Sequence, residues 1–473
     1  MVFNSVIFVL FFIVVVVLHY MPFSWRIKKI NLLIASYFFY AAWNPPFVIL
    51  LWISTCVDWF AAGQMQKQES RGRRKLLLWL SLLVNLGMLS WFKYGTLFMQ
   101  TYADIVAQFG FTWTVPDFDI ILPVGISFYT FQTLSYTIDV YLKRSEPESS
   151  FLDFALFVTF FPQLVAGPIV RPKQLLPQFK SPKRATSQEF SWGAFLFTWG
   201  VFQKSVLADS VCARVSGHAF GFQEEMFAMD AWLSVFAFSA QIFFDFAGYS
   251  LCAIGVALCL GFSIPNNFKS PYAALGFSDF WRRWHISLSE WLRDYLYIPL
   301  GGNKKGGRRT LINLMLTMLL GGLWHGASWR FVVWGGVHGT YLIVERLLRN
   351  VVSPNVNWQN LLPRLVGTTL TFIAVSLTWV FFAAPTWESC EIVFRSLVGH
   401  TTDPLSVMRS VELVLVLIIV FAMLTGHWLM RDRQIEEVAQ SMPNWLFCAV
   451  WVVLLVLIIL TGESDNAFIY FQF

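Results

Sequence analysis

Two neighbouring stretches decide the fold of this chain: residues 280–303, FWRRWHISLSEWLRDYLYIPLGGN, and residues 319–339, LLGGLWHGASWRFVVWGGVHG. The first is aromatic but too polar to lie freely in lipid. The second continues the apolar run TLINLMLTMLLGGLW at 310–324, which His325 closes. We therefore predict that His325 lies at membrane depth. A charged group exposed to lipid there costs at least about 2.5 kcal/mol, so an ionisable residue at that depth normally faces a cavity and has a function.

Composition places the whole chain in the membrane class. The 473 residues are 56% apolar and only 13% charged, about half the charge expected of a soluble protein of this size. Several apolar runs approach the roughly 20 residues that cross a bilayer. We predict an all-α multi-pass membrane protein forming a single domain over 1–473. The opening run 1–20 lacks a basic region and a small-residue cleavage site, so it is expected to be a retained helix.

The basic residues predict an orientation. The net charge of +6 comes from Lys and Arg in short loops between apolar runs, a pattern that anchors a cytoplasmic face to membrane lipid rather than binding nucleic acid. The strongest clusters lie at 67–75, 282–309 and 431–433. Placing all three in the cytoplasm puts both termini on the outside.

Two apolar runs look irregular. Residues 151–174 carry positive charge on both sides and contain Pro162, Gly167 and Pro168 near their middle, which predicts a re-entrant hairpin. Such backbone is tolerated at membrane depth only where protein or water surrounds it, a first indication of a central cavity. The run 231–262 is too long for one perpendicular crossing, so it is expected to be tilted, or broken at Gly248.

The polar block at 279–300 is predicted to form one amphipathic helix at the membrane interface, with an aromatic stripe on one face. The stripe consists of Trp281, Trp284, Leu288, Trp291, Leu292 and Tyr295. The loop GGNKKGGRR at 301–309 follows, and it lacks the Lys and Ser/Thr of a Walker A loop. It can be a simple cytoplasmic loop, a cradle for phosphate groups, or both.

Three kinds of chemistry compete for the histidines. A metal site would need paired ligands such as H-E-x-x-H, or Cys pairs, and the sequence has neither, so no metal is expected. Serine catalysis would need G-x-S-x-G, which is also absent. General-base catalysis needs one near-neutral imidazole shielded from water, which fits His325. Hydrogen bonding between helices is the ordinary role of a lone buried histidine, but it leaves Gly326, His338 and the long polar block unexplained.

Together these motifs resemble the membrane-bound O-acyltransferase family, and within it the bacterial alginate O-acetyltransferase branch. Further matching stretches cover most of the chain: NLLIASYFFYAAW, LPVGISFYTFQTLSYTIDVY, FFPQLVAGPIVRP, IFFDFAGYS, NNFKSPY and the terminal FIYFQF. The resemblance implies that His325 is the catalytic histidine and that His285 occupies the family's second active-site position. It also implies a ring of transmembrane helices around a thin central partition pierced by a tunnel.

The resemblance further implies a reaction at the bacterial inner membrane. Cytoplasmic acetyl-CoA would donate the acetyl group without being permanently bound, and Arg282, Arg283, Lys304 and Lys305 could hold its phosphates. A periplasmic SGNH-type acetyltransferase would pass the group to a polysaccharide, in company with the polysaccharide synthase and secretion complex. Alginate, cellulose and peptidoglycan are all candidate polymers.

Two alternative functions and one further residue stay open at this stage. One alternative is D-alanyl transfer from a carrier-protein thioester to teichoic acid, and the other is a transporter or channel lined by the histidines. The tail GESDNAFIYFQF at 462–473 can be an interfacial aromatic anchor. Because similar tails in the family are thought to act near the outer mouth of the tunnel, we hypothesise that Tyr470 reaches toward His325, as an acyl carrier or a docking element.

Overall fold

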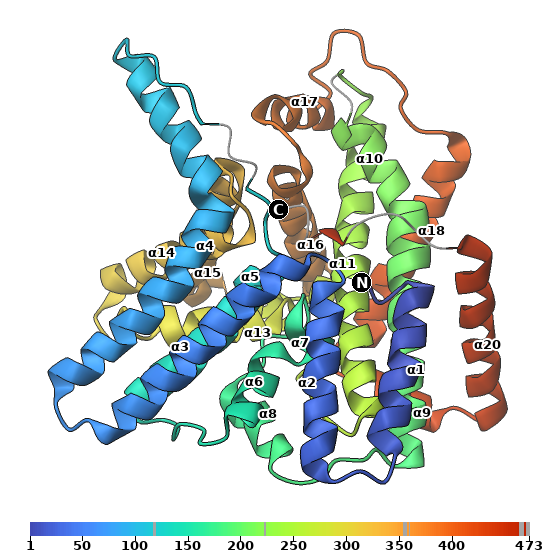
Figure 1. Ribbon diagram of the computed structural model, residues 1–473. Helices are drawn as coiled ribbons and strands as arrows, with labels where there is room; N and C mark the ends of the chain where they lie inside the picture. The colour runs from blue at the N-terminus through green and yellow to red at the C-terminus, as the bar shows by residue number, and fades with distance from the viewer. Residues whose placement is uncertain (117–119, 222–223, 353–356, 359, 463–467, 470–473) are drawn as a thin grey trace. The chain divides into compact units, whose positions relative to one another are not determined.

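The computed structural model describes residues 1–116, 120–221, 224–352, 357–358, 360–462 and 468–469. Helices make up the regular structure of these residues (Figure 1), and their β-pairing is limited to an isolated bridge between Met226 and Leu405. The all-α prediction is therefore confirmed. Six helices of the described part are long and apolar enough to cross a membrane: Pro45–Lys67, Arg71–Gln108, Ala228–Cys259, Leu361–Ala383, Ser410–Leu429 and Asn444–Thr461.

The chain divides into two compact units. The first comprises Met1–Ala194, Ala253–Pro265 and Gly326–Ser328, and the second Phe195–Cys252, Asn266–His325 and Trp329–Phe473. All three histidines of the deciding stretches belong to the second unit.

The first unit is built on three packed helices, α3 (Val48–Lys67), α4 (Arg71–Gln108) and α5 (Ile126–Tyr141). A buried polar cluster joins them: Asn85 Nδ2 donates to Asp58 Oδ2 at 2.9 Å, and its Oδ1 accepts from Thr133 at 3.2 Å. Helix α4 runs without interruption over 38 residues. The remaining helices of this unit are α1 (Val6–Tyr20), α2 (Trp25–Ala41), α6 (Phe151–Thr159), α7 (Phe161–Leu164) and α8 (Pro172–Phe179).

The predicted interruption between 151 and 174 is present. Helix α6 ends at Thr159, and Pro162 lies in the first turn of α7, where proline is tolerated because the missing N–H has no intrahelical partner there. The chain then runs without helix until α8, past Gly167, where a Cβ atom would lie 2.5 Å from Gln163 Cα. Only glycine fits this close approach. Entry from the cytoplasmic face stays a prediction.

A long helix with a π-helical segment leads into the second unit: α9 (Ser187–Val201), η2 (Phe202–Cys212) and α10 (Ala213–Gly221) follow without interruption. Helix α11 (Ala228–Cys259) then runs through Gly248, so of the two predicted alternatives the break at Gly248 is wrong, whereas the tilt stays a prediction. The reason for this glycine is packing: a Cβ atom on Gly248 would lie 2.7 Å from Gly200 O, which means that α9 and α11 touch backbone to backbone.

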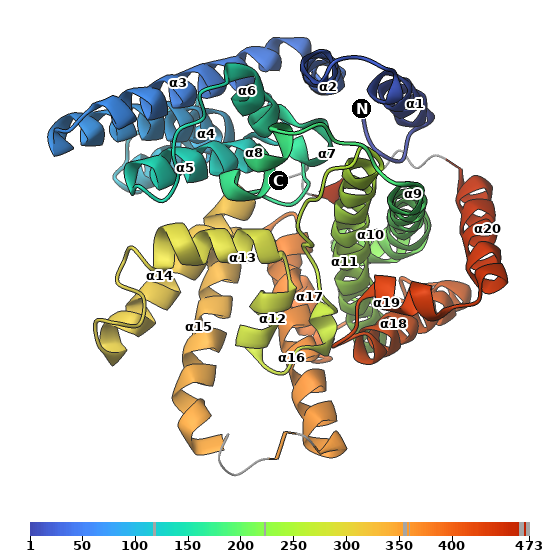
Figure 2. The same ribbon diagram turned by 90° about the horizontal axis from the view of Figure 1, so that it is seen from below.

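The second unit also contains a helical hairpin. Helices α14 (Gly307–His325) and α15 (Trp329–Val352) lie side by side (Figure 2), and Gly322 and Gly335 form their closest approach. Helix α15 also contacts α12 (Phe277–Arg283) and α16 (Leu361–Ala383). The other elements are η3 (Pro271–Ala273), α13 (Ile286–Leu292), η4 (Arg293–Tyr297), α17 (Trp387–Leu397), α18 (Ser410–Leu429), α19 (Ile435–Ser441) and α20 (Asn444–Thr461).

Candidate active site

The amphipathic block does not form one helix, and this correction defines the site. Helix α12 ends at Arg283, α13 begins at Ile286, and His285 between them adopts a left-handed backbone with φ 43° and ψ 55°. That conformation is uncommon for a residue with a side chain and persists only where the surroundings impose it. The apolar stripe still predicts burial correctly, since Trp284, Leu288 and Trp291 are buried whereas Arg282 is exposed.

Asn267 holds His285 in this position. The backbone oxygen of Asn267 accepts from Ile286 N at 2.9 Å, and its side-chain Oδ1 accepts from Ser287 N at 3.2 Å and Ser287 Oγ at 2.9 Å. The same Oδ1 lies 3.2 Å from His285 Nδ1. An amide oxygen can only accept, so Nδ1 carries the proton and Nε2 presents a lone pair. Burial lowers the pKa of His285 to about 3, which keeps the ring neutral.

His325 closes α14 within an aromatic enclosure. Its ring centre lies 5.0 Å from that of Trp334, 5.1 Å from that of Trp324 and 5.6 Å from that of Phe382. The ring of His285 is 6.4 Å away, and both imidazoles are buried, at 3% and 0% exposure. These rings come from different elements, so packing of α14, α15 and α16 around the α12–α13 break assembles the pair. A proton gained by His325 would lie at a helix C-terminus, where the helix dipole favours positive charge.

Two further buried histidines of this unit, His338 and His427, have local partners. His338 Nε2 lies 2.9 Å from Thr378 Oγ1, which joins α15 to α16, and the His338 ring contacts Trp334 at 4.6 Å. His427 Nδ1 accepts from Tyr272 N at 3.3 Å. His338 and His427 thus fit the structural role that is ordinary for a buried histidine.

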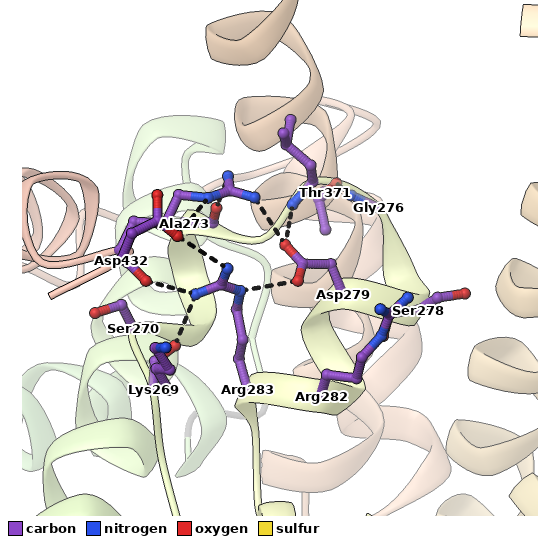
Figure 3. Close-up of polar contacts among 12 residues, drawn as sticks. Lys269, Ser270, Ala273, Gly276, Ser278, Asp279, Arg282, Arg283, Thr371 and Asp432 are labelled. Atoms are coloured by element: carbon purple, nitrogen blue, oxygen red, sulfur yellow. Dashed lines mark hydrogen bonds and ion pairs between the residues drawn. The ribbon is translucent and has the colours of Figure 1, made fainter. Parts of the chain in front are cut away.

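The four basic residues predicted to hold the CoA phosphates divide into two kinds. Arg283 is mostly buried, and its Nε donates to Asp279 Oδ1 at 2.9 Å while Nη1 donates to Lys269 O at 3.3 Å (Figure 3). Arg282 is exposed and bonds through Nε to Ser278 O at 3.1 Å. Lys304 and Lys305 are exposed in the glycine loop.

Asp279 is the centre of an ionic network that fixes α12. Its Oδ2 pairs with Arg431 Nη2 at 3.0 Å, and Arg431 follows the end of α18. Arg283 Nη1 in turn donates to Arg431 O at 2.9 Å, and Nη2 lies 3.8 Å from Asp432 Oδ1 (Figure 3). The network therefore joins two basic clusters, 282–309 and 431–433, that the positive charges alone assign to one face.

Several residues of the site were not singled out from the sequence. Asn267 belongs to NNFKSPY, which was noted only as a matching stretch, and Trp334 and Phe382 look like ordinary residues of apolar helices. The pair Asn266–Asn267, which lies between the apolar run 231–262 and the polar block 279–300, was the sequence feature that could have indicated Asn267. Tyr470 lies outside the described residues.

Similarity to known proteins extends this picture. The sequence profile of the MBOAT, membrane-bound O-acyltransferase, family matches residues 75–384. A probable alginate O-acetylase of Pseudomonas putida is 37% identical over 502 aligned positions, covering 100% of both chains. A peptidoglycan O-acetyltransferase of Helicobacter pylori is 36% identical, covering 78% of this chain and 74% of its own. A teichoic acid D-alanyltransferase of Streptococcus thermophilus is 28% identical, covering 55% and 68%.

Proposed function

This chain belongs to the membrane-bound O-acyltransferase family, and we propose that it transfers an acetyl group from cytoplasmic acetyl-CoA toward an extracytoplasmic polysaccharide. The relatives named as alginate and peptidoglycan O-acetyltransferases, similar over most of their length, support acetyl as the group transferred.

The observation that carries the proposal is the pairing of His285 and His325. Two buried imidazoles from separate elements lie 6.4 Å apart, centre to centre, and aromatic rings surround His325. Maintaining a left-handed residue at the edge of this site costs free energy, of order 1–3 kcal/mol. A general base for the reacting hydroxyl group and a second imidazole that orients the acceptor molecule would account for both features.

In the proposed reaction, the reacting hydroxyl of the acceptor donates its hydrogen bond to His325, and His285 Nε2 accepts from a neighbouring donor group of the acceptor, which turns the reacting hydroxyl toward His325. The His325 imidazole removes the hydroxyl proton as the oxygen attacks the thioester carbonyl carbon. The carbon–sulfur bond breaks, and the imidazolium returns the proton to the departing thiolate, so free CoA and the acetyl ester are the products. Exclusion of bulk water by the surrounding rings strengthens these hydrogen bonds.

The donor side of the site is proposed to be the cytoplasmic basic cluster. Arg282, Lys304 and Lys305 are exposed and could pair with the phosphates of CoA, whereas Arg283 would support them by holding α12 in place. A ring of helices with a thin partition and a tunnel would connect this cluster to the histidines. A re-entrant segment within residues 151–174 is also part of this proposal.

We further propose the setting of the reaction. The enzyme would lie in the bacterial inner membrane with both termini in the periplasm, and a periplasmic SGNH-type acetyltransferase would take over the acetyl group near the polysaccharide synthase and secretion complex. Tyr470 would carry the group briefly or dock that partner. The polymer is alginate, cellulose or peptidoglycan, and the relatives' names favour alginate or peptidoglycan.

One experiment separates this proposal from its alternatives. The purified protein in lipid nanodiscs is supplied with acetyl-CoA and, separately, with a D-alanyl carrier-protein thioester, and release of free thiol is measured. We expect acetyl-CoA to be consumed and His325→Ala to abolish the release. Consumption of the D-alanyl thioester alone would favour teichoic acid chemistry, which the more distant relative represents. Release from neither donor would favour a transporter.

A further inference from the structure

A buried ionic cluster lies on η2 and α11, apart from the residues used above. Lys204 Nζ is 2.8 Å from Asp209 Oδ1 and 2.6 Å from Asp245 Oδ1, and the three side chains are 8%, 3% and 1% exposed. Lys204 is thus shared between two carboxylates, and the ion pair through Oδ1 holds Asp245 in place. The other oxygen of Asp245, Oδ2, can accept a further hydrogen bond.

The C-terminal tail provides one. The backbone N–H of Ile469 donates to Asp245 Oδ2 at 2.8 Å, across 224 residues of sequence. Phe468 and Ile469 are only 1% and 5% exposed. A hydrogen bond from a backbone N–H to a carboxylate is charge-assisted and roughly twice as strong as one between neutral groups. The Asp245 carboxylate thus holds the segment at Phe468 and Ile469 through a main-chain hydrogen bond.

The fixed segment is in contact with the wall of the site. The ring of Phe468 stacks on Tyr249 at 4.7 Å and lies 5.7 Å from Phe246. Phe246 follows Asp245 on α11, and its ring meets His285 edge to face at 4.6 Å. Phe246 therefore touches the tail and the second histidine at once.

We propose that Asp245 is a positioning residue for acyl transfer: it anchors the tail through Ile469 so that Phe468 and Phe246 form a fixed wall beside His285. This inference rests on the proposed function. The π-helical segment η2 supports it, because such segments are frequent at functional sites, and here the segment places Lys204 within reach of both Asp209 and Asp245. Lys204 holds the anchor, and the tail N–H donates to the other oxygen of the Asp245 carboxylate.

The test removes the anchoring bond from either side. Ile469→Pro deletes the N–H donor and leaves the ionic cluster intact, whereas Ile469→Ala retains the donor. Asp245→Ala deletes the acceptor. Asp230→Asn is the matched control, because Asp230 is also a buried carboxylate on α11 that accepts a backbone N–H from a distant segment, Val407, at 2.8 Å.

Two readouts are measured in nanodiscs: hydrogen exchange of the C-terminal peptide, and kcat and KM with acetyl-CoA. We expect Asp245→Ala and Ile469→Pro to remove protection from the peptide and to lower kcat about tenfold with KM unchanged, as for loss of one charge-assisted bond. The double variant should be no worse than the poorer single variant, since both act on one bond. Ile469→Ala should retain protection, and Asp230→Asn should retain both protection and kcat.

Several results would overturn the inference. A protected tail in Asp245→Ala would show that Asp245 is not the anchor, and full kcat with an unprotected tail would remove its role in positioning. Losses that multiply in the double variant would mean independent effects. If Asp245→Ala fails to accumulate, Ile469→Pro still removes the same bond from the side of the tail. If no form consumes acetyl-CoA, the proposed function fails, while hydrogen exchange still decides whether Asp245 holds the tail.

Discussion

The rings of His285 and His325 lie 6.4 Å apart with their planes at 64°, although 39 residues of chain separate them. One ring is presented by a left-handed break between two short helices, and the other by the last residue of a long apolar helix. Neither feature alone makes a reactive site. Their meeting places a neutral hydrogen-bond acceptor beside a candidate base, in surroundings from which aromatic rings exclude water.

The first prediction concerns His325 itself. His325→Ala should leave the protein abundant in the membrane and lower acetyl transfer by about 10²-fold or more, since a positioned general base contributes at least that much. His427→Gln is the control, because a glutamine oxygen can still accept from Tyr272 N. Polymer acetylation and thiol release measure the effect. Normal activity in His325→Ala would assign the ring a structural role only.

Replacing Asn267 should lower kcat because Asn267 holds His285 in position. Asn267→Ala leaves buried donors of Ser287 and His285 without their shared acceptor, which costs about 1–3 kcal/mol, so we expect a lower melting temperature and a kcat reduced about tenfold. In a His285→Ala background the same change should lower stability again but not kcat. A further large drop in kcat there would show that Asn267 acts independently of His285.

Kinetic measurements should distinguish the three exposed basic residues from Arg283. Arg282→Gln, Lys304→Gln and Lys305→Gln each remove an exposed charge, and we expect KM for acetyl-CoA to rise, about tenfold for the strongest, with kcat retained. Arg283→Gln should instead reduce thermal stability, because it breaks the pair with Asp279. KM is measured for acetyl-CoA and for a thioester that lacks the nucleotide phosphates. If the ratio of these two KM values is the same in the variant with all three substitutions as in the unmodified protein, the three residues do not bind the phosphates.

Orientation can be tested by cysteine labelling. Cys56 and Cys448 are exposed and are first replaced. A cysteine at Lys304 should then be reached by an impermeant maleimide only after the membrane is opened, whereas one at Asp403 should react in intact spheroplasts, as expected if basic loops face the cytoplasm. Labelling of the Lys304 site from outside would contradict the proposed topology.

Tyr470 provides the last test. Tyr470→Phe keeps the aromatic ring and removes one oxygen, so a role in acyl carriage predicts loss of polymer acetylation while acetyl-CoA is still bound. Phe473→Leu is a control for simple anchoring of the tail. Full acetylation in Tyr470→Phe, with loss only after several terminal aromatics are replaced, would leave the tail as an anchor.

The sequence by itself determined the class of protein, the family and the candidate histidine. Apolar runs near 20 residues long require backbone hydrogen bonds within each segment, so helices follow from composition. A histidine at the end of such a run is conspicuous because it is costly there. Long matching motifs such as LWHG and NNFKSPY indicated the family, which the comparisons confirm.

Only the tertiary structure decided which residues surround that histidine. The break at His285 was missed because the apolar residues on either side of it keep the spacing of one continuous helix. The left-handed conformation of His285 depends on its contact with Asn267, which lies in a separate segment of the chain. Gly248 was misjudged for a similar reason: a glycine in a helix can mark a bend or a close neighbour, and here the neighbour is Gly200. Periodicity records which face of a helix is apolar, but it contains no information about which distant side chain that face will meet.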